Sequence, residues 1–141
     1  MVGASRVRLW VRALLVWLSF GVVAVVLGTL RVRYLEPALG ALASHQIGTL
    51  AVVGAILLIS FRSVRWLRPA LGLSWAIGGV CVLTTGACEI GVFRFGAGLP
   101  WSTLLAEYDV AAGRLWVLVL VTQLVGLPLA LWISGLSMAR T

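Results

Sequence analysis

Four apolar runs divide the chain, and short segments rich in arginine or other polar residues separate them. The runs cover about residues 9–30, 39–61, 70–93 and 113–137. A helix needs about 20 apolar residues to cross the hydrocarbon core of a bilayer, and each run is that long or slightly longer. The pattern therefore predicts an all-α integral membrane four-helix bundle, with residues 1–141 forming a single transmembrane domain.

The segment between the third and fourth runs has a different pattern. Its aromatic and leucine positions recur at spacings of three, four and seven, which place them on one face of a helix. They are Trp101, Leu104, Leu105 and Tyr108. Most of the remaining positions are polar, and Ser102 can cap the first turn. We expect a short amphipathic helix at about residues 101–109 that lies at the membrane interface.

Composition supports a membrane protein. Hydrophobic residues make up 62% of the chain and charged residues 11%, and the mean hydropathy is +1.11. Soluble domains carry about 25% charged residues. The first run is longer than the apolar core of a cleavable signal peptide, and Thr29-Leu30-Arg31 offers no small-residue cleavage site. We therefore expect an uncleaved anchor helix.

The distribution of arginine predicts the orientation. With a cytoplasmic N-terminus, seven arginines lie on the cytoplasmic side and four on the outer side, so both termini are expected to be cytoplasmic. The seven are Arg6, Arg8, Arg12, Arg62, Arg65, Arg68 and Arg140, and the four are Arg31, Arg33, Arg94 and Arg114. All four acids then lie on or near the outer side. The absence of lysine is typical of a GC-rich genome and favours the bacterial inner membrane.

Small residues form two rows at intervals of four. The second run carries Gly40, Ser44 and Gly48, and the third carries Ala70, Ser74, Gly78 and Gly86. Small residues at this spacing allow helix backbones to approach closely. The rows predict a contact between the second and third helices, and the alternative is that they reflect ordinary membrane-helix composition.

Glu89 is the most informative residue for function, because a carboxylate inside an apolar run is costly and marks a buried pair or a functional site. The first interpretation is a salt bridge to Arg94 or Arg114 that fixes the packing of the third and fourth helices. The second is a site for a proton, a cation or a ligand. The third is exposure of Glu89 to the outer headgroups.

His45 is the only histidine, and it lies beside Gln46 near the start of the second run. Histidine is the commonest metal ligand, and Glu36, Glu89 and Asp109 are the acids that could join it. No metal-binding motif is present, so we expect a hydrogen bond from His45 to another helix and neither a metal nor a cofactor. Asp109 is expected to cap the fourth helix or to pair with Arg114.

These residues resemble a group of small bacterial membrane proteins. The resemblance rests on Glu36, His45-Gln46-Ile47-Gly48, Glu89, Trp101, Leu104, Leu105, Tyr108, Asp109, Gly113 and Arg114. It covers roughly the last three-quarters of the chain and implies four helices with an outer polar cluster. It brings no activity, substrate or cofactor with it.

The candidate site is therefore an outer polar cluster. Its predicted members are Glu36, His45, Gln46, Glu89, Arg94, Trp101, Glu107, Tyr108, Asp109 and Arg114. We expect a structural or accessory role, with the lipid bilayer and a homo-oligomeric or membrane-protein partner around it. The alternative is an oligomeric transporter or channel with a path near Glu89 and His45. An enzyme ranks last, because the sequence contains no nucleophile–base motif, and a nucleic-acid partner is not expected, because the net charge of +7 comes without a recognition motif.

Overall fold

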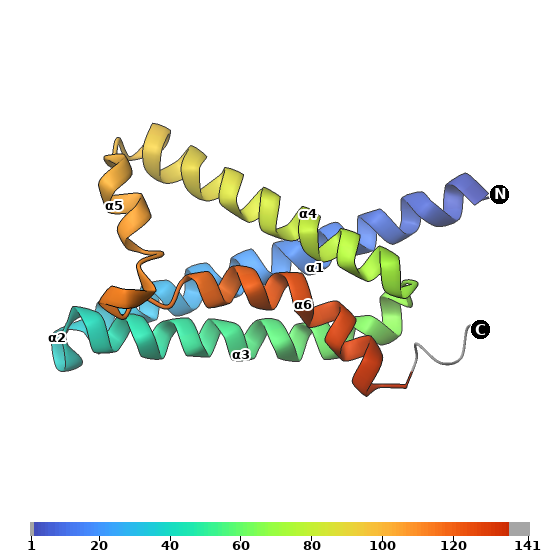
Figure 1. The fold of residues 1–141 in the computed structure, drawn as a ribbon, viewed down its shortest axis with the longest axis horizontal. Coiled ribbons are helices and arrows are strands. Elements are labelled where there is room, and N and C mark those ends of the chain that lie inside the picture. The colour runs from blue at the N-terminus through green and yellow to red at the C-terminus, as the bar shows by residue number, and fades with distance from the viewer. Residues whose placement is uncertain (1, 136–141) are drawn as a thin grey trace.

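The computed structural model describes residues 2–135, with side chains from Arg6 onward. Every regular element in that range is helical, so the all-α prediction is confirmed there. The predicted end of the fourth run at residue 137 and Arg140 lie outside the described residues. The four long helices α1, α3, α4 and α6 run alternately in opposite directions (Figure 1).

The first helix is longer than predicted. Helix α1 (Val2–Leu30) continues without a break through the π-helical segment η1 (Arg31–Leu35) into the short helix α2 (Glu36–Leu39). Gly40 ends this run with a φ of 81°, a conformation that residues with a side chain rarely adopt. Helix α3 (Ala41–Leu67) then returns along the bundle.

The second long hairpin turns at a proline. Arg68 has a left-handed backbone at the end of α3, Pro69 follows, and α4 (Leu71–Glu89) continues into the π-helical segment η2 (Ile90–Gly96). Helix α5 (Trp101–Ala106) follows Pro100, and its first turn has no side-chain cap, so the predicted capping role of Ser102 is wrong. The segment η3 (Val110–Ala112) leads to α6 (Val117–Ile133).

Among residues 2–135, three helical stretches are long and apolar enough to cross a membrane. They are Arg6–Leu39, Ala41–Leu67 and Leu71–Gly96, and the apolar helix Val117–Ile133 is shorter. Large apolar side chains face outward from these helices, including Val25, Leu83 and Phe95 at 70–76% exposure. A surface of this kind suits lipid better than water. The chain is thus a small multi-pass membrane protein by length and composition.

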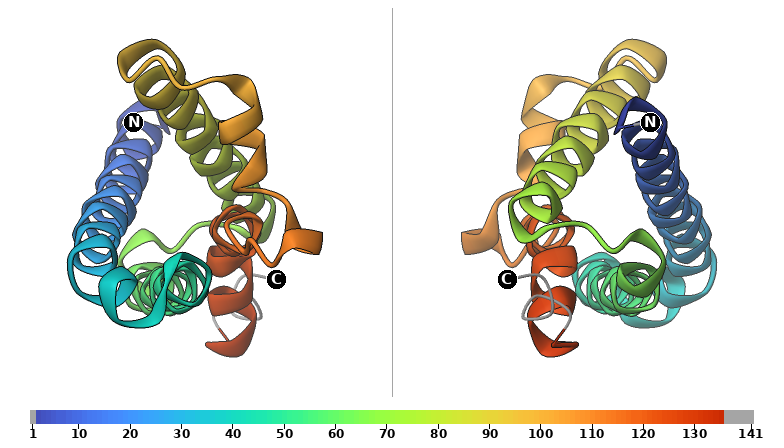
Figure 2. Two further views of the ribbon diagram at one scale, coloured as in Figure 1. Left: turned by 90° about the vertical axis from the view of Figure 1, so that its left-hand side faces the viewer. Right: turned by 90° about the vertical axis from the view of Figure 1, so that its right-hand side faces the viewer.

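Helix α6 packs against both α3 and α4 and separates them (Figures 1 and 2). A Cβ at Gly126 of α6 would lie 2.7 Å from the Ser60 hydroxyl of α3, and a Cβ at Gly78 of α4 would collide with the Leu124 carbonyl of α6. The predicted contact between the small-residue rows of α3 and α4 is therefore wrong. Gly78 serves the contact of α4 with α6, because α6 occupies the space between the two helices.

The apolar core lies where α1 meets the other helices. Phe20 of α1, Ile56 of α3, Ile77 of α4 and Val119 of α6 are 0–3% exposed and belong to one packed cluster. Helix α1 packs mainly along α3 and approaches α4 much less closely. Figure 1 shows α1 and α4 crossing, and the two helices lie well apart toward the end of the bundle where α5 lies, while Figure 2 views the bundle end-on.

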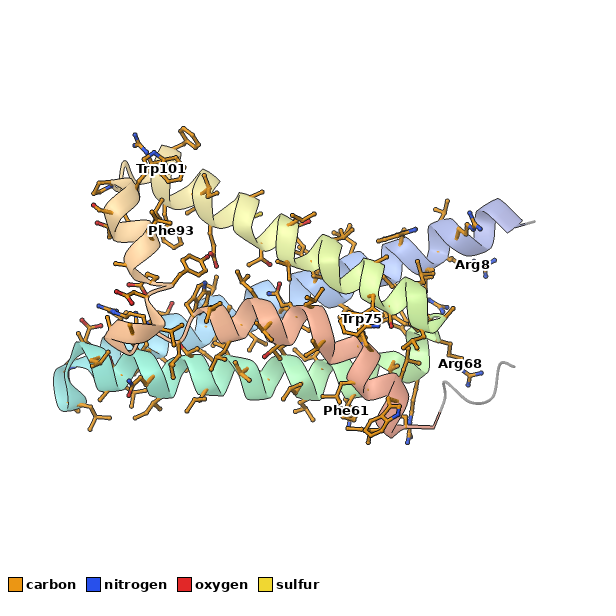
Figure 3. All side chains as sticks on the ribbon, viewed as in Figure 1. Arg8, Phe61, Arg68, Trp75, Phe93 and Trp101 are labelled. Atoms are coloured by element: carbon orange, nitrogen blue, oxygen red, sulfur yellow. The ribbon has the colours of Figure 1, made fainter. Side chains whose placement is uncertain are left out.

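The two ends of the bundle differ in chemistry. Figure 3 shows Arg8 and Arg68 at the end where α1 begins and α3 turns into α4, and Phe93 and Trp101 at the opposite end. We call the first the Arg68 end and the second the α5 end.

Candidate functional site

Polar side chains from two helices and one connection meet at the α5 end. The start of α3 contributes His45 and Gln46, the end of α4 contributes Glu89, and the chain between α5 and α6 contributes the rest. The contacts described below connect these residues, and we call them the polar cluster. Its members are His45, Gln46, Glu89, Glu107, Tyr108, Gly113, Arg114, Leu115 and Trp116.

His45 connects α3 to both sides of the α5–α6 connection. Its side chain is 4% exposed, and its Nδ1 lies 3.2 Å from Oε2 of Glu107. Its Nε2 accepts a hydrogen bond from the backbone N–H of Leu115 at 3.3 Å. An accepting Nε2 carries no proton, so this pattern assigns the neutral tautomer with its proton on Nδ1. The sequence predicted a hydrogen bond from His45 to another helix, whereas both partners lie in the connection between α5 and α6.

Glu107 is shared between two partners. Its Oε1 accepts a hydrogen bond from Nη1 of Arg114 at 3.3 Å, while its Oε2 faces His45. The Glu107 side chain is 42% exposed and Arg114 is 31% exposed, so water screens this ion pair. The pair joins Glu107, which directly follows α5, to Arg114 near the end of the connection to α6.

Gln46 holds the turn that precedes α6. Its Nε2 donates to the carbonyl oxygen of Gly113 at 3.1 Å. Gly113 has a φ of 79°, and an added Cβ would lie 3.1 Å from that same Nε2. A residue with a side chain would therefore be strained there and crowd Gln46, so glycine is required by both the backbone and the contact.

Glu89 forms no salt bridge within the described residues, so the predicted pairing with Arg94 or Arg114 is wrong. Its Oε1 accepts a hydrogen bond from Nε1 of Trp116 at 2.7 Å, and its Oε2 accepts one from the hydroxyl of Tyr108. Arg94 instead lies over the ring of Trp101, with 5.7 Å between Cζ and the ring centroid. Burial, together with the hydrogen bond to Glu89, raises the pKa of Tyr108 above its ordinary value.

A second polar group lies deeper between the helices. The indole of Trp17 donates to the hydroxyl of Thr85 at 3.0 Å, and that hydroxyl donates to Oε1 of Gln123 at 2.9 Å. Sequence reasoning missed these three residues and Trp116. The signal was that Thr85 precedes Glu89 by four positions and so shares its face of α4.

The remaining predicted residues do not join the cluster. Glu36 lies 3.9 Å from Arg31 near Gly40, and Arg94 and Trp101 contact each other. Asp109 accepts a hydrogen bond from the N–H of Ala112, so it caps η3 and not α6. Among residues 2–135, no three histidine, cysteine or acidic side chains gather as metal ligands do. The combination of His45, Glu36, Glu89 and Asp109 is thus not assembled.

Comparison with protein-family models, curated proteins and solved structures finds no match to this chain. The family resemblance therefore stays a prediction. The geometry of the chain carries the functional argument alone.

Proposed function

We propose that the chain crosses the membrane four times, with both termini in the cytoplasm. Helix α6 has 17 residues and rises about 25 Å at 1.5 Å per residue. That length is at the lower limit of about 17–25 residues for a spanning helix, and Trp116 and Trp132 lie near its two ends as interfacial anchors do. The α5 end is then the outer end. The arginine bias toward the Arg68 end supports this orientation, and the bacterial inner membrane stays the predicted location.

The topology is tested by cysteine labelling. In a background where Cys81 and Cys88 are alanine, we expect Thr103→Cys to react with a membrane-impermeant maleimide added to the outer side. Ala70→Cys, at the Arg68 end, should react only after the membrane is opened. Both positions are exposed in the structure. Labelling of Ala70→Cys from outside would reverse the orientation.

We further propose a structural or accessory role, in which the polar cluster closes the outer end of the bundle. The observation that carries this proposal is that both carboxylates of the cluster are occupied by the chain's own groups. Glu107 contacts His45 and Arg114, and Glu89 accepts from Tyr108 and Trp116. Satisfied polar networks of this kind hold elements together. A homo-oligomer or a membrane-protein partner fits this role.

The variant Glu89→Gln tests the structural role. An amide has one accepting oxygen, whereas the Glu89 carboxylate uses both oxygens, so one donor loses its partner. We expect the free energy of unfolding in detergent to fall by about 1–3 kcal/mol, with no change in ion flux across liposomes. Gln46→Ala, which removes a neighbouring contact but no carboxylate, is the matched control for flux. Unchanged stability in Glu89→Gln would contradict the structural role.

The second candidate is an oligomeric transporter or channel. The observation that favours it is the hydrogen-bonded group of Trp17 on α1, Thr85 on α4 and Gln123 on α6, in which Thr85 lies four residues before Glu89. A path along this face predicts proton or cation flux in liposomes that well-folded Glu89→Gln loses. Equal flux in wild type and in Glu89→Gln would exclude Glu89 as part of such a path.

A further inference from the structure

A groove lies between the end of α1 and the first half of α3, at the α5 end. Leu27, Leu30 and Leu35 form one wall, and Ile47 and Ala51 form the other. Its volume of about 340 Å³ falls within the range of small-molecule pockets, which is about 300–1,000 Å³. The walls are apolar, and the one charged residue that lines the groove is Arg31.

Gly48 of α3 sets the position of Arg31. A Cβ at Gly48 would lie 2.6 Å from Cδ and 3.2 Å from Cγ of Arg31. The aliphatic part of the arginine therefore lies directly on the glycine backbone. The absence of a side chain at position 48 lets Arg31 remain inside the groove, where it is 25% exposed.

The positive charge of the Arg31 guanidinium is only weakly neutralised by other groups of the chain. Among residues 2–135 its one ion-pair partner is Glu36, and the 3.9 Å between Nη1 and Oε2 is too long for a hydrogen bond. A guanidinium beside apolar walls gains most from an anion that accepts two of its N–H groups, and phosphate is such an anion. A second copy of the chain docked symmetrically would bring another Arg31 toward the first, so like charges disfavour it.

We propose that this groove binds an anionic phospholipid, with Arg31 on the phosphate and the leucine wall along an acyl chain. The inference rests on the proposed membrane topology, in which the groove opens toward outer-leaflet lipid. Tyr34 lines the groove beside Arg31 and is 62% exposed. Tyrosine is enriched at the level of the headgroups, so its position agrees with a phosphate bound at Arg31.

The test measures lipid retained by the purified protein in detergent, by native mass spectrometry. Phosphatidylglycerol is the probe, and diacylglycerol with the same acyl chains lacks the phosphate. We expect wild type to retain phosphatidylglycerol about ten- to a hundredfold more strongly than diacylglycerol. Arg31→Gln removes the charge, and Gly48→Ala displaces Arg31 without changing any charge. Both variants should lose that preference.

Two matched controls accompany these variants. Arg33→Gln removes an exposed arginine outside the groove, and Gly54→Ala adds a methyl group to α3 where nothing lies within 4 Å. Both should bind phosphatidylglycerol like wild type. Equal retention of the two lipids by wild type, unchanged binding in Arg31→Gln, or displacement of the lipid by an equal concentration of inorganic phosphate would overturn the proposal. Failure of the topology appears separately in the cysteine labelling.

Discussion

The carboxylate of Glu89 accepts a hydrogen bond from the indole of Trp116, with 2.7 Å between Oε1 and Nε1. Glu89 ends α4, and Trp116 directly precedes α6. The other carboxylate oxygen accepts from Tyr108, which follows α5. One carboxylate therefore joins α4 to both ends of the connection between α5 and α6.

Trp116→Phe removes the indole donor and keeps an aromatic ring in the same place. We expect the free energy of unfolding to fall by about 1–2 kcal/mol, because Glu89 loses one of two hydrogen bonds. Denaturation in mixed detergent micelles measures the change. Trp132→Phe, at a position that is 69% exposed, is the control and should have little effect. Equal losses in the two variants would show that the contact with Glu89 contributes nothing specific.

Glu107→Gln should loosen the start of α6 locally. The variant removes the charge that faces His45 and Arg114, and the expected loss is about 0.5–1 kcal/mol because the pair is partly exposed. The backbone N–H of Leu115 donates a hydrogen bond to Nε2 of His45. Hydrogen exchange in nanodiscs should show faster exchange at this N–H in the variant than in wild type. Glu36→Gln removes a carboxylate at the same end outside the cluster, and it should leave that N–H unchanged. The same rate in Glu107→Gln as in wild type would refute the link.

Gly78→Ala should destabilise the packing of α4 on α6. The added methyl group meets the backbone carbonyl of Leu124, which cannot move as a flexible side chain can. Overpacking of this kind costs about 1–3 kcal/mol. The adjacent Gly79 has open space, so Gly79→Ala should be neutral or slightly stabilising. Thermal unfolding of both variants makes the comparison, and equal melting temperatures would contradict the close approach.

Tyr108 should make the fold sensitive to alkaline pH. Burial and the neighbouring Glu89 and Glu107 carboxylates raise the native-state pKa of Tyr108 above the ordinary value of about 10. The unfolded chain releases this proton more readily, so stability is complete below pH of about 10 and falls as the pH rises beyond it. Unfolding measured from pH 8 to pH 11 should therefore decline more steeply in wild type than in Tyr108→Phe. Parallel declines would contradict the assignment.

For several contacts at the α5 end, the sequence predicted that a residue needs a partner but not which residue the partner is. The cost of a carboxylate in an apolar run indicates that Glu89 needs a partner, yet the predicted partners were arginines. Arg114 pairs with Glu107 instead, and Arg94 stacks on Trp101. Opposite charge is visible in a sequence, whereas the neutral donors that reach Glu89 depend on where the α5–α6 connection folds back.

The sequence by itself determined the all-α class, the apolar helices and the segment where polar chemistry gathers, because hydrophobic runs and their interruptions depend on local composition. Only the tertiary structure decided which helices touch. The small residues of α3 and α4 follow the same spacing, but α6 lies between them and takes Gly78 as its contact. Packing order and hydrogen-bond partners depend on long-range geometry, which the spacing of residues along a single helix does not contain.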